Sequence, residues 1–147
     1  MVRQLQPWFE NLKKRQVKSP KIYIRDSGIL HSLLTLKDKA ILTHVKVGAS
    51  WEGYVIEQII QQVQTRDFYY WRTHSGAELD LLVIKDGKRI GFEIKYSEIA
   101  KITRSMNIVI DDLKLDKLYL VNKGTRQISL GEKIEVLPAE QLISTTF

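Results

Sequence analysis

The sequence predicts a single α/β domain with a mixed central β-sheet flanked by helices. At 147 residues, with 44% hydrophobic and 27% charged residues, the chain has the length and composition of one compact globular domain. Apolar residues recur at helical spacing in some segments and at every second position in others, which is typical of mixed helices and strands. Asp86-Gly87, between two alternating runs, is the strongest short-range signal for a β-hairpin.

Strands and helices are expected to follow one another along the chain. Before the hairpin we expect a strand at 21–25, followed by a helix that Asp26 or Ser27 caps. A loop over 37–49 then leads to a helix over about 51–64 that Ser50 caps, and a strand at 68–72 follows. After the hairpin strands at 77–84 and 88–96 we expect a helix that Thr103 caps, strands at 117–121 and 133–137, and a last helical turn in PAEQLI.

The composition excludes several classes of protein and site. The chain has no cysteine, which excludes disulfides and thiolate metal sites. Its three histidines form no H-x-x-x-H pair, which argues against a zinc site. No apolar stretch approaches about 18 residues, and the N-terminus lacks the apolar run of a signal peptide. We therefore expect a cytoplasmic protein with no membrane partner.

The net charge of +6 comes from the N-terminus. Residues 1–25 hold seven Lys and Arg against one acid, whereas residues 26–147 hold 16 of each sign. Such a segment attracts phosphate backbones or an acidic partner. It is equally a solvated face that keeps the protein soluble, because no aromatic residue for base stacking lies within its basic run. The DNA-binding candidates are Lys13, Lys14, Arg15, Lys18 and Lys21, with Arg72 one strand before the hairpin.

The hairpin determines which side chains face one another. If Asp86 and Gly87 are the central residues of a type I′ turn, the residue numbers of every cross-strand pair add up to 173. The opposed pairs then include Asp80 with Glu93 and Glu78 with Lys95, which share one face. The other face is expected to be apolar and to contain Leu79, Leu81, Val83, Ile90, Phe92 and Ile94.

Opposed carboxylates point to a cation. Asp80 and Glu93 would repel each other unless a positive charge lay between them, and a hard divalent ion such as Mg²⁺ or Mn²⁺ prefers oxygen ligands. Glu52 falls near the middle of the apolar stripe of the helix over 51–64, where burial costs free energy unless the acid meets a partner. Alternatively, Glu52 is a first-turn acid that the helix macrodipole favours. Glu57 falls on the opposite, Gln-rich face.

These residues resemble a known constellation. An inward helix Glu, an Asp on one strand and a Glu-x-Lys on the next look like the PD-(D/E)xK nucleases of the restriction-endonuclease-like fold. The segments VKSPKIYIRDSGILHSLL, GASWEGYVIEQII, YYWRTHSGAELDLLV and GFEIKYS resemble the C-terminal domain of unknown function 4143 behind bacterial and archaeal AAA+ ATPase modules. The resemblance covers about residues 2–143 and implies a restriction-endonuclease-like core. Leu79 replaces the proline of the motif.

The resemblance implies a DNA nuclease that depends on Mg²⁺ or Mn²⁺. Position by position, it assigns Glu52, Asp80, Glu93 and Lys95 as catalytic residues, with Asp80 and Glu93 as the metal ligands. Lys95 would orient the attacking water, and Glu52 would hold a water on the metal or a second ion. Three alternatives are open: a surface salt-bridge lattice, a non-catalytic module that docks on or regulates an AAA+ ATPase, and DNA binding without cleavage.

Relatives of this kind usually carry an ATPase half before this region. The chain contains no G-x-x-x-x-G-K-[ST] phosphate loop, so we do not expect it to hydrolyse ATP itself. We interpret residues 1–20 as a basic N-terminal seam with a missing ATPase half, and residues 21–147 as the PD-(D/E)xK-like domain. An AAA+ ATPase module is then an expected partner.

Overall fold

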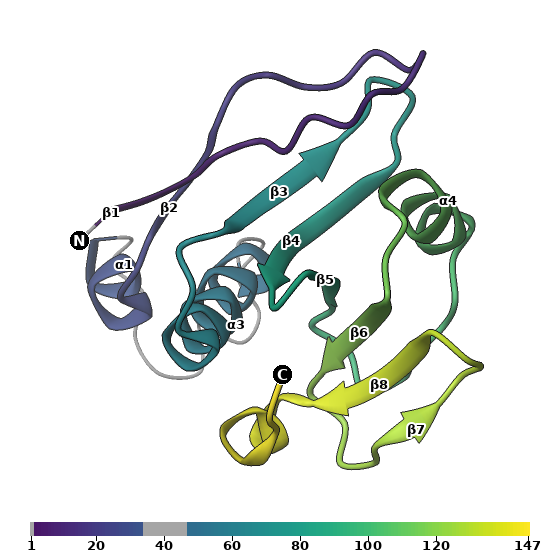
Figure 1. Ribbon diagram of the computed structural model, residues 1–147. Helices are drawn as coiled ribbons and strands as arrows, with labels where there is room; N and C mark the ends of the chain where they lie inside the picture. Colours follow the sequence, from purple (N-terminus) through teal and green to yellow (C-terminus); the bar gives the residue numbers. More distant parts are fainter. Residues whose placement is uncertain (1, 34–46) are drawn as a thin grey trace.

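A six-stranded mixed β-sheet lies at the centre of the molecule (Figure 1). The computed structural model describes residues 2–33 and 47–147. In spatial order, the strands are β3 (Phe68–Arg72), β4 (Glu78–Lys85), β5 (Lys88–Ile94), β6 (Lys117–Asn122), β8 (Ile134–Pro138) and β7 (Ile128–Ser129). β5, β6 and β8 run parallel, and the other neighbours are antiparallel. The predicted α/β class with a mixed sheet is confirmed.

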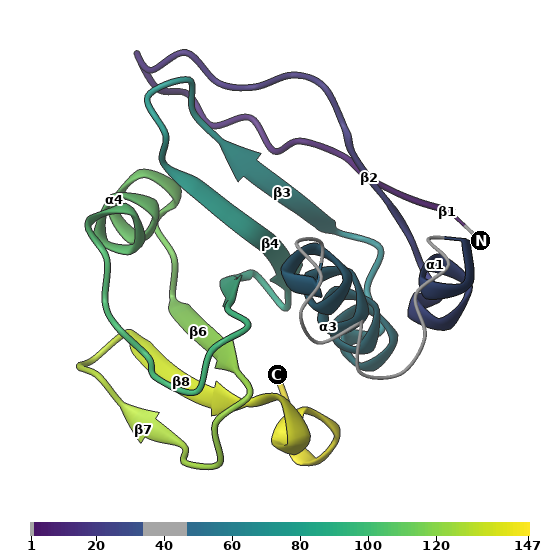
Figure 2. The same ribbon diagram turned by 180° about the vertical axis from the view of Figure 1, so that it is seen from behind.

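One longer helix packs on each face of this sheet (Figure 1 and Figure 2). α3 (Val47–Val63) shares a buried cluster with Leu81, Val83 and Phe92, whereas α4 (Arg104–Leu113) shares a second one with Leu79, Leu82 and Leu118. The described residues also contain two shorter helical segments, α1 (Ser27–Leu33) and the 3₁₀ helix η1 (Ala139–Ser144). No helix in the described ranges is long and apolar enough to cross a membrane.

The N-terminal residues cover the open edge of β3. β1 (Val2–Leu5) pairs antiparallel with β2 (Lys21–Ile24), and the chain between them runs along β3 (Figure 1). The backbone N–H groups of Trp8 and Val17 donate to the carbonyls of Tyr70 and Arg72, at 2.7 and 2.9 Å. This cover satisfies backbone groups that an exposed edge strand would offer to other chains.

The predicted hairpin register is confirmed where the ladder is formed. The pairs run from Lys85 with Lys88 to Leu81 with Phe92, and in every pair the two residue numbers add up to 173, as predicted. Asp86 and Gly87 have φ values of 51° and 74°, as a type I′ turn requires. The turn residues were therefore sufficient to predict this register.

A bulge in β4, which was not predicted, changes which residues share a face. Tyr69 faces Leu82 but Trp71 faces Leu79, so two steps along β3 correspond to three along β4. The extra residue breaks the alternation, and Leu81 packs with α3 while Leu79 packs with α4. The expectation that Leu79 and Leu81 lie on one apolar face is therefore wrong.

The helix starts are confirmed in part. The Asp26 carboxylate accepts a hydrogen bond from Ile29 N at 3.0 Å, and Thr103 Oγ1 accepts one from Met106 N at 3.3 Å, so both predicted caps are present. The cap predicted at Ser50 is wrong, because α3 already begins at Val47. The rest of the loop expected over 37–49 lies outside the described residues. The short strands β1 and β7 were not predicted.

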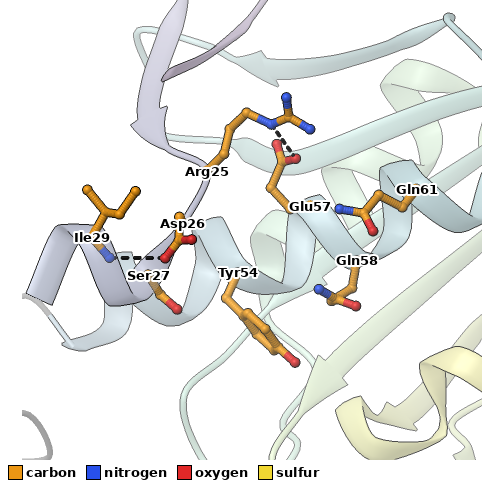
Figure 3. A pocket seen from close by; sticks show the side chains of 8 residues that line it. All are labelled: Arg25, Asp26, Ser27, Ile29, Tyr54, Glu57, Gln58 and Gln61. Atoms are coloured by element: carbon orange, nitrogen blue, oxygen red, sulfur yellow. Dashed lines mark hydrogen bonds and ion pairs between the residues drawn. The ribbon is translucent and has the colours of Figure 1, made fainter. Parts of the chain in front are cut away.

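A buried ion-pair cluster ties β1 and β2 to α3. The Glu57 carboxylate accepts hydrogen bonds from Arg3 Nε at 2.5 Å and from Arg25 Nε at 2.8 Å. Figure 3 shows the second contact beside a pocket of about 480 Å³. Burial raises the pKa of Glu57, but the two guanidinium groups outweigh it and hold this pKa below its ordinary value. The placement of Glu57 on a polar surface is thus wrong, because the N-terminal strands cover this part of α3.

We predict that Glu57→Gln lowers the free energy of unfolding by roughly 3 kcal/mol, because it leaves two partly buried guanidinium groups without their charge partner. Urea unfolding at neutral pH measures this change. Glu132→Gln is the matched control: Glu132 is exposed and forms no ion pair within the described residues, so its effect should stay below about 0.5 kcal/mol. Equal effects of the two substitutions would contradict the structural role given to Glu57.

Candidate functional site

The ammonium group of Lys21 lies among three carboxylates. Its Nζ is 2.5 Å from Glu52 Oε1, 3.3 Å from Glu78 Oε1 and 3.6 Å from Asp80 Oδ1. Burial lowers the pKa of Lys21, but the charges of Asp80 and Glu52 raise it by more, so the ammonium stays charged. We call these four residues the lysine–carboxylate cluster.

Three elements, β2, α3 and β4, bring the cluster together. Lys21 is the first residue of β2, and its position is held by backbone pairing with Leu5 of β1. Glu52 lies in the second turn of α3, and Glu78 is the first residue of β4. Asp80 belongs to the bulged part of β4, where the backbone departs from the pairing with β3. Bulges redirect side chains in this way next to functional sites.

Asp80 is the most buried acid of the cluster. Its Oδ2 accepts a hydrogen bond from Ile94 N at 2.8 Å, which leaves Oδ1 directed at Lys21. Burial and the charges of Glu93 and Glu52 raise the pKa of Asp80 to about 7, even though Lys21 and the Ile94 N–H act in the opposite direction. One ammonium group therefore does not supply all the positive charge that these acids need.

Glu93 and Lys95 form a second ion pair beside Asp80. Lys95 Nζ is 2.6 Å from Glu93 Oε1, and the Lys95 side chain is 47% exposed. Burial raises the pKa of Glu93 although Lys95 opposes it, while the pKa of Lys95 is raised because Glu93 outweighs the effect of burial. The backbone ladder ends one pair before Asp80 and Glu93. All four predicted catalytic residues, Glu52, Asp80, Glu93 and Lys95, nonetheless lie within electrostatic reach of one another.

The donor atoms of this site fit a hard divalent cation. The acids offer only carboxylate oxygens, which Mg²⁺ and Mn²⁺ prefer, and the pKa of Asp80 is raised first by burial and then by the neighbouring acids Glu93 and Glu52. Within residues 2–33 and 47–147, however, no group of three or more His, Cys, Asp or Glu side chains is arranged to hold a metal ion. The carboxylates of Glu52, Glu78 and Asp80 are directed at Lys21 instead, so a metal would need them to regroup.

The structure divides the predicted DNA-binding residues into two groups. Lys21 belongs to the cluster, Lys14 Nζ lies 2.6 Å from Asp112 Oδ2, and Arg72 Nε lies 3.6 Å from Glu78 Oε2. These three side chains are therefore engaged with acids of the chain itself. The other three candidates are exposed and form no ion pair in the part of the chain that the structure describes; they are Lys13, Arg15 and Lys18.

A basic groove of about 530 Å³ lies next to the end of β3. Its lining comprises Lys14, Arg15 and Lys18 together with Phe9, Gln16 and His74. The Phe9 ring is 50% exposed, and an exposed aromatic ring beside cations is typical of surfaces that bind single-stranded nucleic acid. Phe9 escaped the sequence analysis because it lies before the basic run rather than within it.

Sequence reasoning assigned neither Glu78 nor Lys21 to the cluster, although it named Lys21 as a DNA-binding candidate. Glu78 was placed on the same face as Asp80, which was a usable signal, but it was not taken as a site residue. Lys21 gave no signal of its location, because its partners lie 31 to 59 positions away in other elements.

Comparisons with known proteins match two family models to two segments of the chain. A family model described as Domain of unknown function (DUF4143) matches residues 47–142, and one described as Domain of unknown function (DUF8612) matches residues 1–40. Uncharacterized protein Rv2008c of Mycobacterium tuberculosis and Uncharacterized protein Mb2031c of Mycobacterium bovis are each 47% identical over 146 residues, 99% of this chain and 33% of those proteins. The chain thus spans about a third of these curated relatives. Lys21 falls in the first matched segment and its three acids in the second.

We predict that Asp80→Asn stabilises the metal-free chain at alkaline pH. A carboxyl group with a pKa of about 7 in the folded state, against 3.8 ordinarily, holds its proton more tightly when folded, so the stability of the wild type falls as the pH rises between these values. Asn cannot ionise, and the gain should grow from near zero at about pH 4 to at most roughly 4 kcal/mol at about pH 8.

Urea unfolding in the presence of a chelator at both pH values measures this difference. Asp86→Asn is the control, since Asp86 is exposed in the hairpin turn and Asn is well accepted there. An Asp80→Asn chain that is less stable than the wild type at about pH 8 would contradict the prediction.

Proposed function

The chain belongs to the DUF4143 family of domains, and from this premise we propose that its acidic site is a metal-dependent nuclease-like site of the PD-(D/E)xK type that hydrolyses DNA phosphodiester bonds. One observation carries the proposal. The buried Asp80 lies within electrostatic reach of Glu93 and Glu52, beside a Glu-x-Lys strand whose lysine reaches solvent. Buried carboxylates with raised pKa values are costly to stability and are typical of functional sites.

The fold is consistent with this proposal. A mixed sheet with one helix on each face is the arrangement expected for the restriction-endonuclease-like core that the sequence resembles. The β4–β5 hairpin presents Asp80 and Glu93 on neighbouring strands, and α3 contributes Glu52 from one face of the sheet. The catalytic acids would then rest on rigid elements rather than on loops, which favours precise positioning.

Each residue has a role that its surroundings permit. Asp80 and Glu93 would hold Mg²⁺ or Mn²⁺, and such an ion supplies positive charge at the phosphate and lowers the pKa of water. The half-exposed ammonium of Lys95 would contact the phosphate and orient the attacking water. Glu52 would add negative charge and a hydrogen-bond acceptor from α3. The basic groove with Phe9 would bind the DNA strand.

A second candidate is a non-catalytic module that docks on an AAA+ ATPase. The observation in its favour is the lysine–carboxylate cluster itself, because Lys21 compensates part of the acidic charge without any metal ion. The chain covers only 33% of the curated relatives, so an ATPase module elsewhere in such longer proteins is proposed here as the partner. Metal binding and DNA cleavage distinguish the two candidates.

We predict that the chain nicks supercoiled plasmid in Mn²⁺ and that Lys95→Ala reduces nicking by at least about a hundredfold, because it removes a cation directed at the phosphate. Mn²⁺ affinity, measured by calorimetry, should not fall, since Lys95 does not hold the ion and its ammonium, 2.6 Å from Glu93 Oε1, competes with the ion for that carboxylate. Lys88→Ala, an exposed lysine at the hairpin turn, is the control and should leave nicking unchanged. Mn²⁺ binding without nicking would favour the docking module, and no response at millimolar Mn²⁺ would contradict the nuclease proposal.

We predict that three exposed bases dominate the salt dependence of DNA binding. Replacing Lys13, Arg15 and Lys18 by Gln should reduce the slope of log Kd against log salt by up to about three, because each phosphate contact contributes roughly one unit. Fluorescence anisotropy with labelled DNA measures the slope. A triple replacement of Lys88, Lys101 and Arg126 by Gln removes the same charge elsewhere on the surface and should change the slope less. Equal slopes in the two triple variants would place the DNA surface elsewhere.

A further inference from the structure

Lys21 is placed where a cation of the site would be expected. Its Nζ lies within 4 Å of oxygens from three acids, and two of these, Glu52 and Asp80, belong to the proposed catalytic set. The contact with Asp80 involves Oδ1. Oδ2 already accepts a hydrogen bond from Ile94 N, so Oδ1 is the less engaged oxygen and the better placed for an ion. The ammonium thus faces the same atom that a metal would use.

A lysine side chain is well suited to a contact that can be broken. Lys has a flexible four-carbon stem and a compact ammonium group with three donors. The backbone of Lys21 is held by its pairing with Leu5, but its side chain is 28% exposed and so has access to solvent. The side chain can therefore leave the carboxylates without displacement of β2.

We propose that Lys21 is a built-in competitor of the divalent cation, so that the metal can bind to Asp80 only after the Lys21 ammonium has moved out of the lysine–carboxylate cluster. This inference rests on the proposed function, because it assigns the control of metal loading to that same site. Two cations at contact distance from one carboxylate oxygen repel each other strongly in a partly buried site. The free site is accordingly closed to metal by a residue of the N-terminal segment.

The test is Mn²⁺ binding by calorimetry to the full 147-residue chain, with Lys21→Met as the variant. Without the competing ammonium, Mn²⁺ should bind at least about tenfold more tightly, which corresponds to about 1.4 kcal/mol. Lys21→Arg keeps a cation at this position and should bind Mn²⁺ within about twofold of the wild type. Lys88→Met removes the same charge far along the hairpin and should also stay within about twofold.

The outcomes separate this inference from the proposed function. Equal affinities of Lys21→Met and wild type, or weaker binding by Lys21→Met, would overturn the competition while leaving the nuclease proposal standing, because the wild type still binds the ion. No Mn²⁺ binding by any of these chains at millimolar concentration would overturn the metal site itself and the competition with it.

A second measurement uses the wild-type chain and does not depend on how Lys21→Met folds. Acetylation of lysines by an activated ester, followed by mass spectrometry, reports whether an amine is engaged or free. Saturating Mn²⁺ should increase the labelling of Lys21 severalfold and leave that of Lys88 unchanged. Labelling of Lys21 that stays constant while Mn²⁺ binds would show that the ion and the ammonium occupy different positions, which contradicts the proposal.

Discussion

Carboxylates gathered beside the buried part of a sheet require positive charge, and in this protein Lys21 supplies part of it. The requirement is strict because Asp80 is nearly inaccessible to water, so its ionised form depends on Lys21, on the Ile94 N–H and on the charge of Lys95. Much of the remaining architecture serves to bring this lysine to the acids. Lys21 belongs to a two-stranded sheet, β1 with β2, that is separate from the main one, and the chain between these strands is hydrogen-bonded to β3.

Two further contacts keep that segment in place. Glu57 joins Arg3 of β1 and Arg25 just after β2 to the middle of α3, and the chain between the two strands follows the edge of β3. The N-terminal residues thereby cover a strand edge, neutralise a buried acid and deliver an ammonium group to the candidate site. Their basic character has a structural explanation that is independent of DNA: several of these bases are paired with acids from the rest of the chain.

The sequence predicted features that depend on local chemistry and missed those that depend on distant partners. The register of the hairpin follows from Asp86 and Gly87 because a two-residue turn dictates which residues pair. The bulge at Asp80 could not be predicted from local turn residues, since it appears only in the pairing of β4 with β3. Helical periodicity singled out Glu52 but placed Glu57 on the surface, because periodicity does not reveal a second segment packed on the helix.

The proposed catalytic residues illustrate the same limit. Alternation along two adjacent strands was enough to place Asp80, Glu93 and Lys95 near one another, and the apolar stripe of α3 was enough to add Glu52. Neither pattern contains Lys21. From the sequence, the opposed acids Asp80 and Glu93 therefore indicated a metal ion as their source of positive charge, whereas in the fold the Lys21 ammonium also lies beside Asp80. Charge balance within a site thus depends on tertiary contacts that residue spacing does not reveal.

The most direct test is the anomalous diffraction of Mn²⁺ in crystals of the chain grown with this ion. The account predicts an anomalous peak in contact with Asp80 Oδ1 and Glu93, with the Lys21 ammonium no longer within ion-pair distance of Asp80. The contrary result is a crystal grown in millimolar Mn²⁺ in which Lys21 is still bound to its three carboxylates. Either the absence of a peak at Asp80 or a peak beside the undisplaced ammonium would then contradict the proposed competition between Lys21 and the metal.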